Sequence, residues 1–169
     1  MSLETINFEH LRLTENDKLL DLGCGEGRHA LSAYIARDLK VYAVDLSLSD
    51  LKTTKSRFIE SYESENKKKT LSIAAADAKN LPFQDNEFDS VICSEVLEHI
   101  HDYKSVLSEI FRVLKNGGVA SVSVPRFFPE WICWQLSDAY HEVKGGHVRI
   151  FKKQRLLEEI EETGLRFKK

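Results

Sequence analysis

The sequence predicts a doubly wound α/β fold, with a mostly parallel sheet of about five strands, in a single domain spanning residues 1–169. Short apolar and β-branched runs alternate along the chain with stretches of helical periodicity. A glycine-rich turn joins the first of these runs to a helix, as is typical of a βα unit. The hydrophobic share of 42% and the charged share of 30% are those of a globular protein with one core. Strands that alternate with helices in this way form parallel sheets covered on both faces.

The first half of the chain is expected to supply three strands and two longer helices. A short turn of helix around Phe8 and residues 11–13 precedes them. The pattern predicts these elements in order: a strand over Lys18–Leu22, a helix over Arg28–Asp38, a strand over Lys40–Asp45, a helix capped by Ser47 or Ser49 that runs to about Glu65, and a strand over Leu71–Ala76.

The second half of the chain is expected to supply two further strands and two further helices. In order, these are a strand over Phe88–Cys93, a helix over Tyr103–Lys115 capped by Asp102, a strand over Val119–Val124 and a last helix over Lys152–Thr163. Gly117 and Gly118 are expected to end the third helix, and Gly164 the last one.

Composition and charge exclude several classes of function. The net charge of −3 is too small, and of the wrong sign, for a nucleic-acid binder. No apolar run has the length of a membrane span, and the N-terminus lacks a signal-peptide pattern. The three cysteines, Cys24, Cys93 and Cys133, are far apart and form no metal-binding pair. Free thiols fit a reducing compartment, so we expect a cytoplasmic protein.

The glycine-rich turn carries the first indication of function. Gly23, Gly25 and Gly27 lie between the end of a strand and the start of a helix. Such a turn is expected to leave free N–H groups, and the positive end of the helix dipole, directed at one spot. This arrangement would form a cradle for a nucleotide or a carboxylate. Asp45 ends the next strand, about 20 residues further on, where an acidic side chain can accept hydrogen bonds from ribose hydroxyls.

The series Asp21-x-Gly23-x-Gly25-x-Gly27 resembles the signature of class I S-adenosylmethionine-dependent methyltransferases. The dinucleotide-binding pattern Gly-x-Gly-x-x-Gly would need a glycine where the chain has Arg28, which disfavours a nicotinamide-dependent oxidoreductase. Further matches lie at 81–83, 88–92 and 147–151, so the resemblance covers nearly the whole chain. It is closest to the broad small-molecule methyltransferase group that contains the ubiquinone-pathway enzymes. It implies a Rossmann-like fold, S-adenosylmethionine as cofactor and a small-molecule acceptor.

The resemblance also implies a set of cofactor-binding residues at the carboxyl ends of the strands. Asp45 would hold the ribose and Leu46 would lie against the adenine, whereas Asp77 and the Ala78 N–H would contact the adenine edge. The backbone that follows the fourth strand would hold the methionine part. The full set is Asp21, Gly23, Cys24, Gly25, Gly27, Asp45, Leu46, Asp77, Ala78, Ser94 and Glu95. Alternatively, Asp45 serves as a helix cap and Asp77 as a turn former.

The segment Glu95-x-x-Glu98-His99 is similar to a metal-binding segment of some ubiquinone-pathway O-methyltransferases and small-RNA methyltransferases. With His147 as a distant fourth ligand, it would bind Mg²⁺, Mn²⁺ or Zn²⁺. Metal-free relatives share this segment, so the alternative is that Glu98 and His99 only position the loop. No catalytic residue is assigned. His99, His141 and His147 are candidate general bases, since imidazole titrates near neutrality.

The region after the fifth strand bears on the acceptor and on assembly. Aromatic residues between Phe127 and Tyr140 would line an acceptor pocket or form a lid over the sheet. The family sheet has seven strands, and the last two would follow the helix that ends at Gly164. We therefore expect five strands without the family's C-terminal hairpin, which leaves a methyltransferase-like binding module without activity as the alternative function. The uncharged run Val119–Val124 would then be an open edge, so we expect a homodimer unless the aromatic segment covers it.

Overall fold

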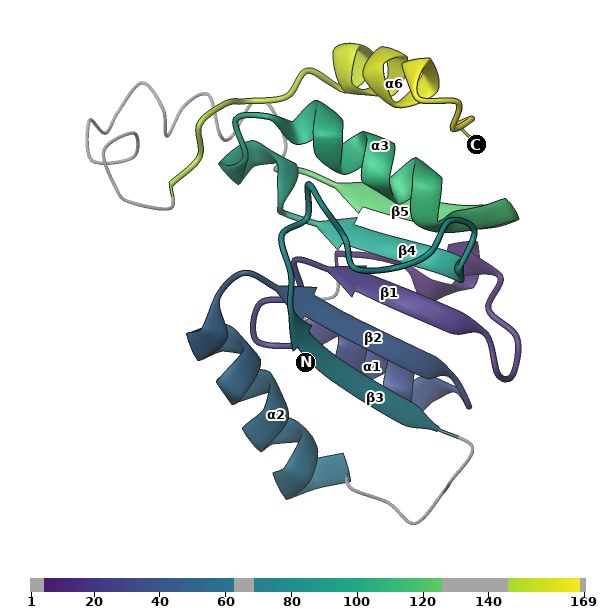
Figure 1. The fold of residues 1–169 in the computed structure, drawn as a ribbon, viewed down its shortest axis with the longest axis vertical. Coiled ribbons are helices and arrows are strands. Elements are labelled where there is room, and N and C mark those ends of the chain that lie inside the picture. Colours follow the sequence, from purple (N-terminus) through teal and green to yellow (C-terminus); the bar gives the residue numbers. More distant parts are fainter. Residues whose placement is uncertain (1–4, 63–68, 126–145, 168–169) are drawn as a thin grey trace.

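Five parallel strands form one sheet, in the spatial order β3-β2-β1-β4-β5, in the computed structural model of the chain (Figure 1). The structure describes residues 5–62, 69–125 and 146–167. The strands are β1 (Lys18–Leu22), β2 (Lys40–Asp45), β3 (Thr70–Ala75), β4 (Phe88–Ser94) and β5 (Leu114–Ser123). The expected doubly wound α/β fold is confirmed, and every pair of neighbouring strands in this sheet is parallel.

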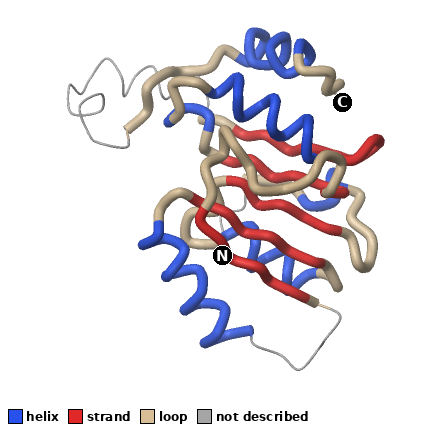
Figure 2. The backbone as a smooth tube through the Cα atoms, in the orientation of Figure 1, coloured by secondary structure: helices blue, strands red, loops and turns tan. Residues whose placement is uncertain are grey.

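In the described parts of the chain, four α-helices and two short 3-10 helices connect or flank the strands (Figure 2). They are α1 (Arg28–Ala36), α2 (Leu48–Tyr62), α3 (Tyr103–Val113), α6 (Lys153–Glu162), η1 (Phe8–Leu11) and η2 (Leu97–His99). Ser47 caps α2, because its hydroxyl oxygen accepts a hydrogen bond from the Asp50 N–H, at 3.3 Å. Among the described residues, none of the helices has both the length and the apolar character needed to cross a membrane.

Side chains alternate between the two faces of the sheet, as strand geometry requires. On β1, Leu20 and Leu22 belong to a buried cluster that includes residues of α3 and α6. Leu19, which directly precedes Leu20 in the strand, belongs to a second cluster that includes residues of η1, α1 and α2. All three leucines are at most 1% exposed. Each face of the sheet therefore has its own apolar core, and the near-continuous apolar strands reflect burial from both sides.

The junction between α3 and β5 differs from the prediction. The helix was expected to reach Lys115, but it ends at Val113, and Leu114 is already extended, with a ψ of 132°. Leu114 pairs with Phe88 of β4, and both side chains are buried. Burying Leu114 within the sheet therefore outweighs the local helical pattern. Gly117 and Gly118 do not end a helix; they lie inside β5, where the pairing with β4 shifts register.

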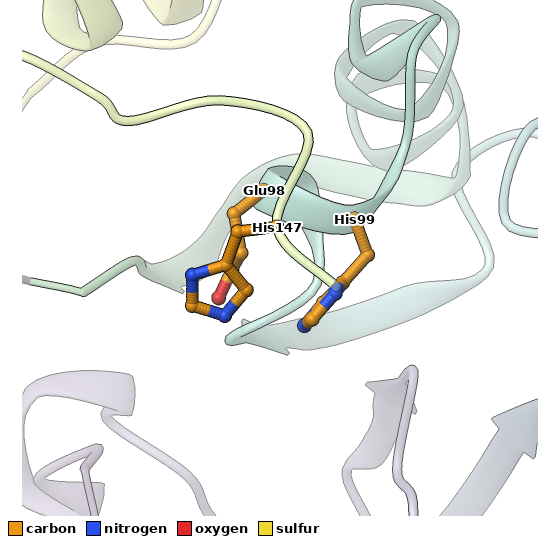
Figure 3. A group of neighbouring side chains, drawn as sticks. All are labelled: Glu98, His99 and His147. Carbon is orange, nitrogen blue, oxygen red and sulfur yellow. The ribbon is translucent and has the colours of Figure 1, made fainter. Parts of the chain in front are cut away.

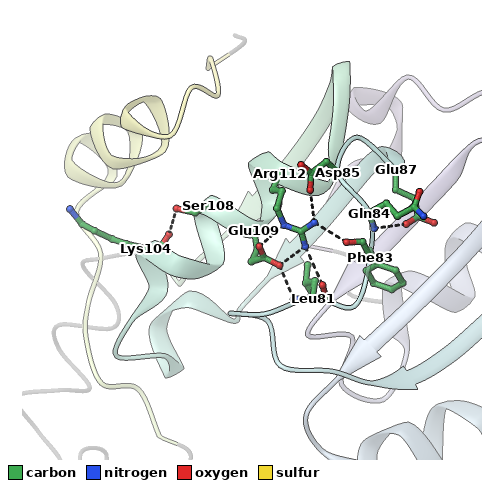
Figure 4. Close-up of polar contacts among 9 residues, drawn as sticks. All are labelled: Leu81, Phe83, Gln84, Asp85, Glu87, Lys104, Ser108, Glu109 and Arg112. Carbon is green, nitrogen blue, oxygen red and sulfur yellow. Dashed lines mark hydrogen bonds and ion pairs between the residues drawn. The ribbon is translucent and has the colours of Figure 1, made fainter.

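An arginine on α3 holds the chain segment that leads from β3 to β4 (Figure 4). The Arg112 guanidinium donates to the carbonyls of Leu81 and Phe83, at 3.1 and 2.8 Å, and to the carboxylate of Glu109. Glu109 in turn accepts a hydrogen bond from the Leu81 N–H, at 2.7 Å. A further ion pair joins Arg112 to Asp85. These bonds fix the loop that leaves the carboxyl end of β3 on top of α3.

The strand order reverses between β1 and β4, which lie side by side with Leu22 opposite Cys93. From β1 the chain proceeds through β2 to β3 on one side, and it returns to build β4 and β5 on the other. Ligands of open α/β sheets bind at such a reversal, outside the carboxyl ends of the strands. The fold therefore places the glycine-rich turn after β1 beside Glu95, which follows β4, at the expected binding position.

Candidate functional site

The three glycines of the turn after β1 all have positive φ angles: +70° at Gly23, +51° at Gly25 and +82° at Gly27. Residues with a side chain rarely adopt this conformation. A Cβ atom at Gly23 would lie 2.3 Å from a methyl group of Val96, and one at Gly27 would lie 2.5 Å from the methyl group of Thr54. At Gly25 no atom lies within 4 Å of that position. Gly25 is therefore the glycine whose bare backbone faces open space that a ligand can enter.

The expectation that the N–H groups of this turn are free is wrong for four of them. The turn folds back on the end of β2, where backbone and side-chain oxygens accept its hydrogen bonds. The bonds run from Gly23 and Cys24 to the Val44 carbonyl at 2.8 and 3.0 Å, from Gly25 to the Asp45 carboxylate at 2.8 Å, and from Gly27 to the Cys24 carbonyl at 2.9 Å. These N–H groups hold the turn in shape instead of forming an open cradle.

Asp45 lies where the sequence predicts a ribose-binding carboxylate, at the carboxyl end of β2. One of its oxygens accepts from the Gly25 N–H and the other from the Ser47 N–H, both at 2.8 Å. A carboxylate offers about four acceptor positions, so two stay available for ligand hydroxyls. Leu46, the next residue, is 74% exposed and presents apolar surface beside them. Asp45 therefore shapes the loop and still fits the predicted binding role.

Asp21 has a different surrounding from the other predicted cofactor residues. Its side chain is 1% exposed, and it accepts a hydrogen bond from the Ala30 N–H of α1, at 2.8 Å. Burial raises the pKa of Asp21 to about 7, although the hydrogen bond from Ala30 and the charge of Arg28 act in the opposite direction. Asp21 ties the end of β1 to the first turn of α1. In this structure it supports the glycine turn from inside the protein.

Cys24 of the same turn is also buried, at 8% exposure. Burial, followed by the charges of Asp21 and Asp45, raises the pKa of the Cys24 thiol. The thiol lies 3.6 Å from the Gly25 carbonyl oxygen, to which it donates. Cys24 therefore stays a neutral thiol that packs inside the turn.

Asp77 and Ala78 follow β3, at the far side of the site. One Asp77 oxygen accepts from the Lys79 N–H at 2.9 Å, and the other lies 3.6 Å from the Lys79 ammonium. Asp77 thus forms the turn that the alternative interpretation predicts. Its side chain is 45% exposed, so ligand contact is compatible with this arrangement. Ala78 is partly buried and packs against the core.

Ser94 and Glu95 follow each other at the carboxyl end of β4. Glu95 has a φ of +57°, an uncommon conformation for a residue with a side chain and typical of a functional turn. One of its carboxylate oxygens accepts from the Ser123 hydroxyl of β5, at 3.1 Å. The Ser94 hydroxyl lies 2.9 Å from the same serine hydroxyl and 2.6 Å from that of Thr5.

Glu98, His99 and His147 form a cluster that contains most of the predicted metal ligands (Figure 3). One possible ligand atom from each residue lies within 4.8 Å of the others, and the two imidazole centroids are 4.7 Å apart. The Val148 N–H donates to the Glu98 carbonyl at 2.8 Å, and His99 Nδ1 lies 3.2 Å from the Gly146 carbonyl. These two contacts bring the segment that carries His147 onto η2.

Two predicted candidates do not enter this cluster. Glu95 is not part of it, because its carboxylate is turned toward Ser123 of β5. His141 and the aromatic residues between Phe127 and Tyr140 lie outside the described residues.

The structure also brings to the site residues that sequence reasoning missed. Thr54 of α2 is fully buried and donates to the Gly25 carbonyl at 2.9 Å. Thr5 and His29 approach Ser94 from the N-terminal segment and from α1. Ser123 lies at the end of a predicted strand, so its position at the carboxyl edge could have been recognised. Nothing in the local pattern around the other three residues indicates such contacts.

Comparison with known proteins gives a consistent picture. A family model described as a methyltransferase domain matches residues 20–122. The sterol 24-C-methyltransferase of Aspergillus fumigatus is 36% identical over 138 residues, which are 82% of this chain and 33% of that protein. The demethylmenaquinone methyltransferase of Renibacterium salmoninarum is 36% identical over 115 residues, 66% of this chain and 44% of that protein. The chain thus spans less than half the length of these two curated relatives.

A solved structure extends the comparison to the fold. An S-adenosylmethionine-dependent methyltransferase of Methanosarcina mazei matches 95% of this chain and 85% of its own, with a TM-score of 0.78. The sequence identity of the two proteins is 18%, so this likeness shows that they share a fold.

The contacts of the glycine turn lead to a stability prediction. Alanine at any of the three positions would adopt a positive φ, at a cost of about 1–2 kcal/mol. Alanine at Gly23 or Gly27 would also collide with Val96 or Thr54, and such overpacking costs about 1–3 kcal/mol more. We therefore expect Gly23→Ala and Gly27→Ala to lower the free energy of unfolding, measured in urea, more than Gly25→Ala. Equal losses in the three variants would contradict the contacts described here.

Proposed function

The chain belongs to the methyltransferase domain family, whose cofactor is S-adenosylmethionine, and from this premise we propose that it transfers the methyl group of that cofactor to a small-molecule acceptor. The observation that carries the proposal is the link between Asp45 and Gly25. This hydrogen bond joins the carboxylate predicted to bind a ribose to the glycine whose backbone faces open space. Both lie at the point where the strand order reverses. The adenosine part would lie over the ends of β2 and β3, with its ribose on Asp45 and its base beside Leu46.

The proposed reaction needs little chemistry from the protein. The acceptor atom attacks the methyl carbon in line with the sulfur, so that the carbon–sulfur bond breaks as the new bond forms. The sulfonium loses its positive charge in this step. Catalysis then rests mainly on positioning the two reactants and excluding water. His99 and His147 stand near the end of β4, where a general base could take a proton from the acceptor.

The relatives support a small-molecule acceptor without identifying it. Two of them are named for a sterol and for demethylmenaquinone, which are both apolar ring compounds. We therefore propose an acceptor of modest size that includes an apolar ring. The alternative from the sequence, a binding module without activity, shares the same cofactor site and differs only in turnover.

Binding of S-adenosylhomocysteine tests the cofactor site. We expect calorimetric titration to give a dissociation constant in the micromolar range. Asp45→Asn should weaken binding at least about tenfold, because the amide can accept fewer hydrogen bonds, and bonds to a charged group contribute about 1.5–3 kcal/mol each. Asp50→Asn, on the first turn of the nearby α2, is the matched control and should bind normally.

Two outcomes of this titration separate the hypotheses. Absence of binding to the unaltered protein would refute the proposed function. Binding without methyl transfer to any member of a panel of sterols, quinols and phenols would favour the inactive binding module.

We also propose that Glu98, His99 and His147 can hold a divalent metal ion. One carboxylate and two imidazoles are a suitable donor set for Zn²⁺, Mn²⁺ or Fe²⁺. Because the Gly146 carbonyl can only accept, His99 Nδ1 carries the hydrogen and Nε2 is left for the metal. Metal bonds of about 2.1 Å require donor atoms within about 4.2 Å of one another, so the cluster needs only a small side-chain rotation. Bound there, a metal would polarise an acceptor oxygen.

Cobalt titration tests the metal proposal without any assay of activity. We expect Co²⁺ to produce visible absorption bands with the unaltered protein, and His99→Ala and His147→Ala to abolish them. His101→Ala is the control, because His101 is an exposed neighbour outside the cluster. Equal loss in the control variant, or no bands at all, would support the simpler role in which Glu98 and His99 only position the loop.

We further propose that the outer edge of β5 takes part in self-association. Within the described parts of the chain, β5 pairs with β4 alone, and the residues from Val119 to Ser123 carry no charge. An unprotected strand edge offers N–H and C=O groups to a second chain. We expect sedimentation at micromolar concentration to show a dimer, which Ser121→Lys should shift toward monomer. A monomer in both cases would disprove the proposed association.

A further inference from the structure

Five side chains from four parts of the fold are joined by four consecutive hydrogen bonds. His29 Nε2 lies 3.1 Å from the Thr5 hydroxyl, which lies 2.6 Å from the Ser94 hydroxyl. Ser94 lies 2.9 Å from the Ser123 hydroxyl, which donates to the Glu95 carboxylate at 3.1 Å. The series begins on α1, passes through the N-terminal segment and the ends of β4 and β5, and ends at the site.

The Glu95 carboxylate, at the end of the series, determines the direction in which the hydrogen bonds are donated. An ionised carboxylate can only accept, so the Ser123 proton points at Glu95. Ser123 must then accept from Ser94, and Ser94 must accept from Thr5, because each hydroxyl has only one proton to donate. The Thr5 hydroxyl in turn accepts from His29, whose Nε2 must therefore carry a hydrogen. Every proton in the series points toward Glu95.

The series is partly buried. His29 is 4% exposed and Ser94 8% exposed, whereas Thr5 is exposed and Ser123 and Glu95 are half-buried. Aligned hydrogen bonds polarise one another, and here they all stabilise negative charge on Glu95. Packing holds Thr5 in place, because its neighbour Ile6 is buried and the Phe8 ring makes an edge contact with the His29 ring.

We propose that His29, Thr5, Ser94 and Ser123 are positioning residues that hold the Glu95 carboxylate at the carboxyl ends of β4 and β5, where it takes up a positively charged group of the bound ligand. The proposal rests on the proposed function for the identity of that ligand. With adenosine over β2 and β3, the amino-acid end of the cofactor extends toward β4. The group that Glu95 would meet is then the α-ammonium.

The direction of the series is tested without any ligand, by the ring nitrogen signals of His29 in the full chain labelled with ¹⁵N-histidine. At about pH 8.5, where an ordinary imidazole is neutral, we expect the hydrogen on Nε2. In Glu95→Gln the amide can donate to Ser123 and reverse the series, and in Ser123→Ala the series is cut. In both variants the tautomer with hydrogen on Nδ1 should become detectable, although His29 lies several side chains away.

Matched controls separate this effect from a general disturbance of the fold. Ser121→Ala lies two residues back on β5, and Glu26→Gln lies on the glycine turn, where Glu26 pairs with Arg57. Neither control should change the His29 tautomer. If both test variants keep the tautomer of the unaltered protein, or if that protein already carries the hydrogen on Nδ1, the directional series does not exist.

A comparison of two ligands tests the role of Glu95. S-adenosylhomocysteine has the amino-acid part, whereas 5′-methylthioadenosine lacks it. Glu95→Gln should weaken binding of the first by about tenfold, the loss expected for one charge-assisted hydrogen bond, and leave the second nearly unchanged. Thr5→Val should produce part of the same selective loss, and Thr5→Ser should restore it. Equal weakening of both ligands would overturn the assignment, whereas failure of the unaltered protein to bind either ligand would refute the proposed function itself.

Discussion

The turn after β1 depends on three glycines with positive φ angles, and two of them also lie against neighbouring side chains that leave no room for a Cβ atom. The space that a Cβ atom would need at Gly23 is filled by Val96, and the space at Gly27 by Thr54. Val96 follows the end of β4 and Thr54 lies on α2, so two separate elements pack against the turn. A third contact, the hydrogen bond from the Gly25 N–H to the Asp45 carboxylate, ties the turn to β2. These contacts define the shape of the turn without any ligand, and a defined shape is what positioning a reactive group requires.

Local patterns in the sequence predict the elements of this fold well, but they fail where a contact between distant residues determines the bounds of an element. The last helix and the first two strands agree with their predicted bounds to within one residue, because apolar periodicity and caps are local signals. The helix before β5 was predicted too long, since Gly117 and Gly118 mark a stop and the pairing of Leu114 with Phe88 leaves no local trace. The spatial order of the strands likewise follows from chain topology, not from periodicity.

In the candidate site, too, local signals predict the positions of residues but not their distant contacts. The positions of Asp45 and Asp77 could be predicted, because the ends of parallel strands meet at one edge of the sheet. The hydrogen-bond partners of the site residues could not be predicted, and these partners alter the role of each residue. Asp21 matches the motif but is buried against Ala30, and the turn's N–H groups are occupied by Val44 and by Asp45. Thr5 and His29 have no motif at all, since their connection to the site runs through side chains brought together only by the fold.

Several carboxylates occupy equivalent places at the ends of neighbouring strands, and their surroundings give them different properties. Asp21 is enclosed, and burial raises its pKa, whereas Asp45 is half-buried and accepts hydrogen bonds from two backbone N–H groups. Glu95 accepts from a hydroxyl at the end of an ordered series. An edge lined by carboxylates favours a ligand with positive charge. S-adenosylmethionine carries such a charge on its sulfur and loses it when the methyl group leaves, so the same electrostatic attraction that helps the cofactor to bind is weaker for the product.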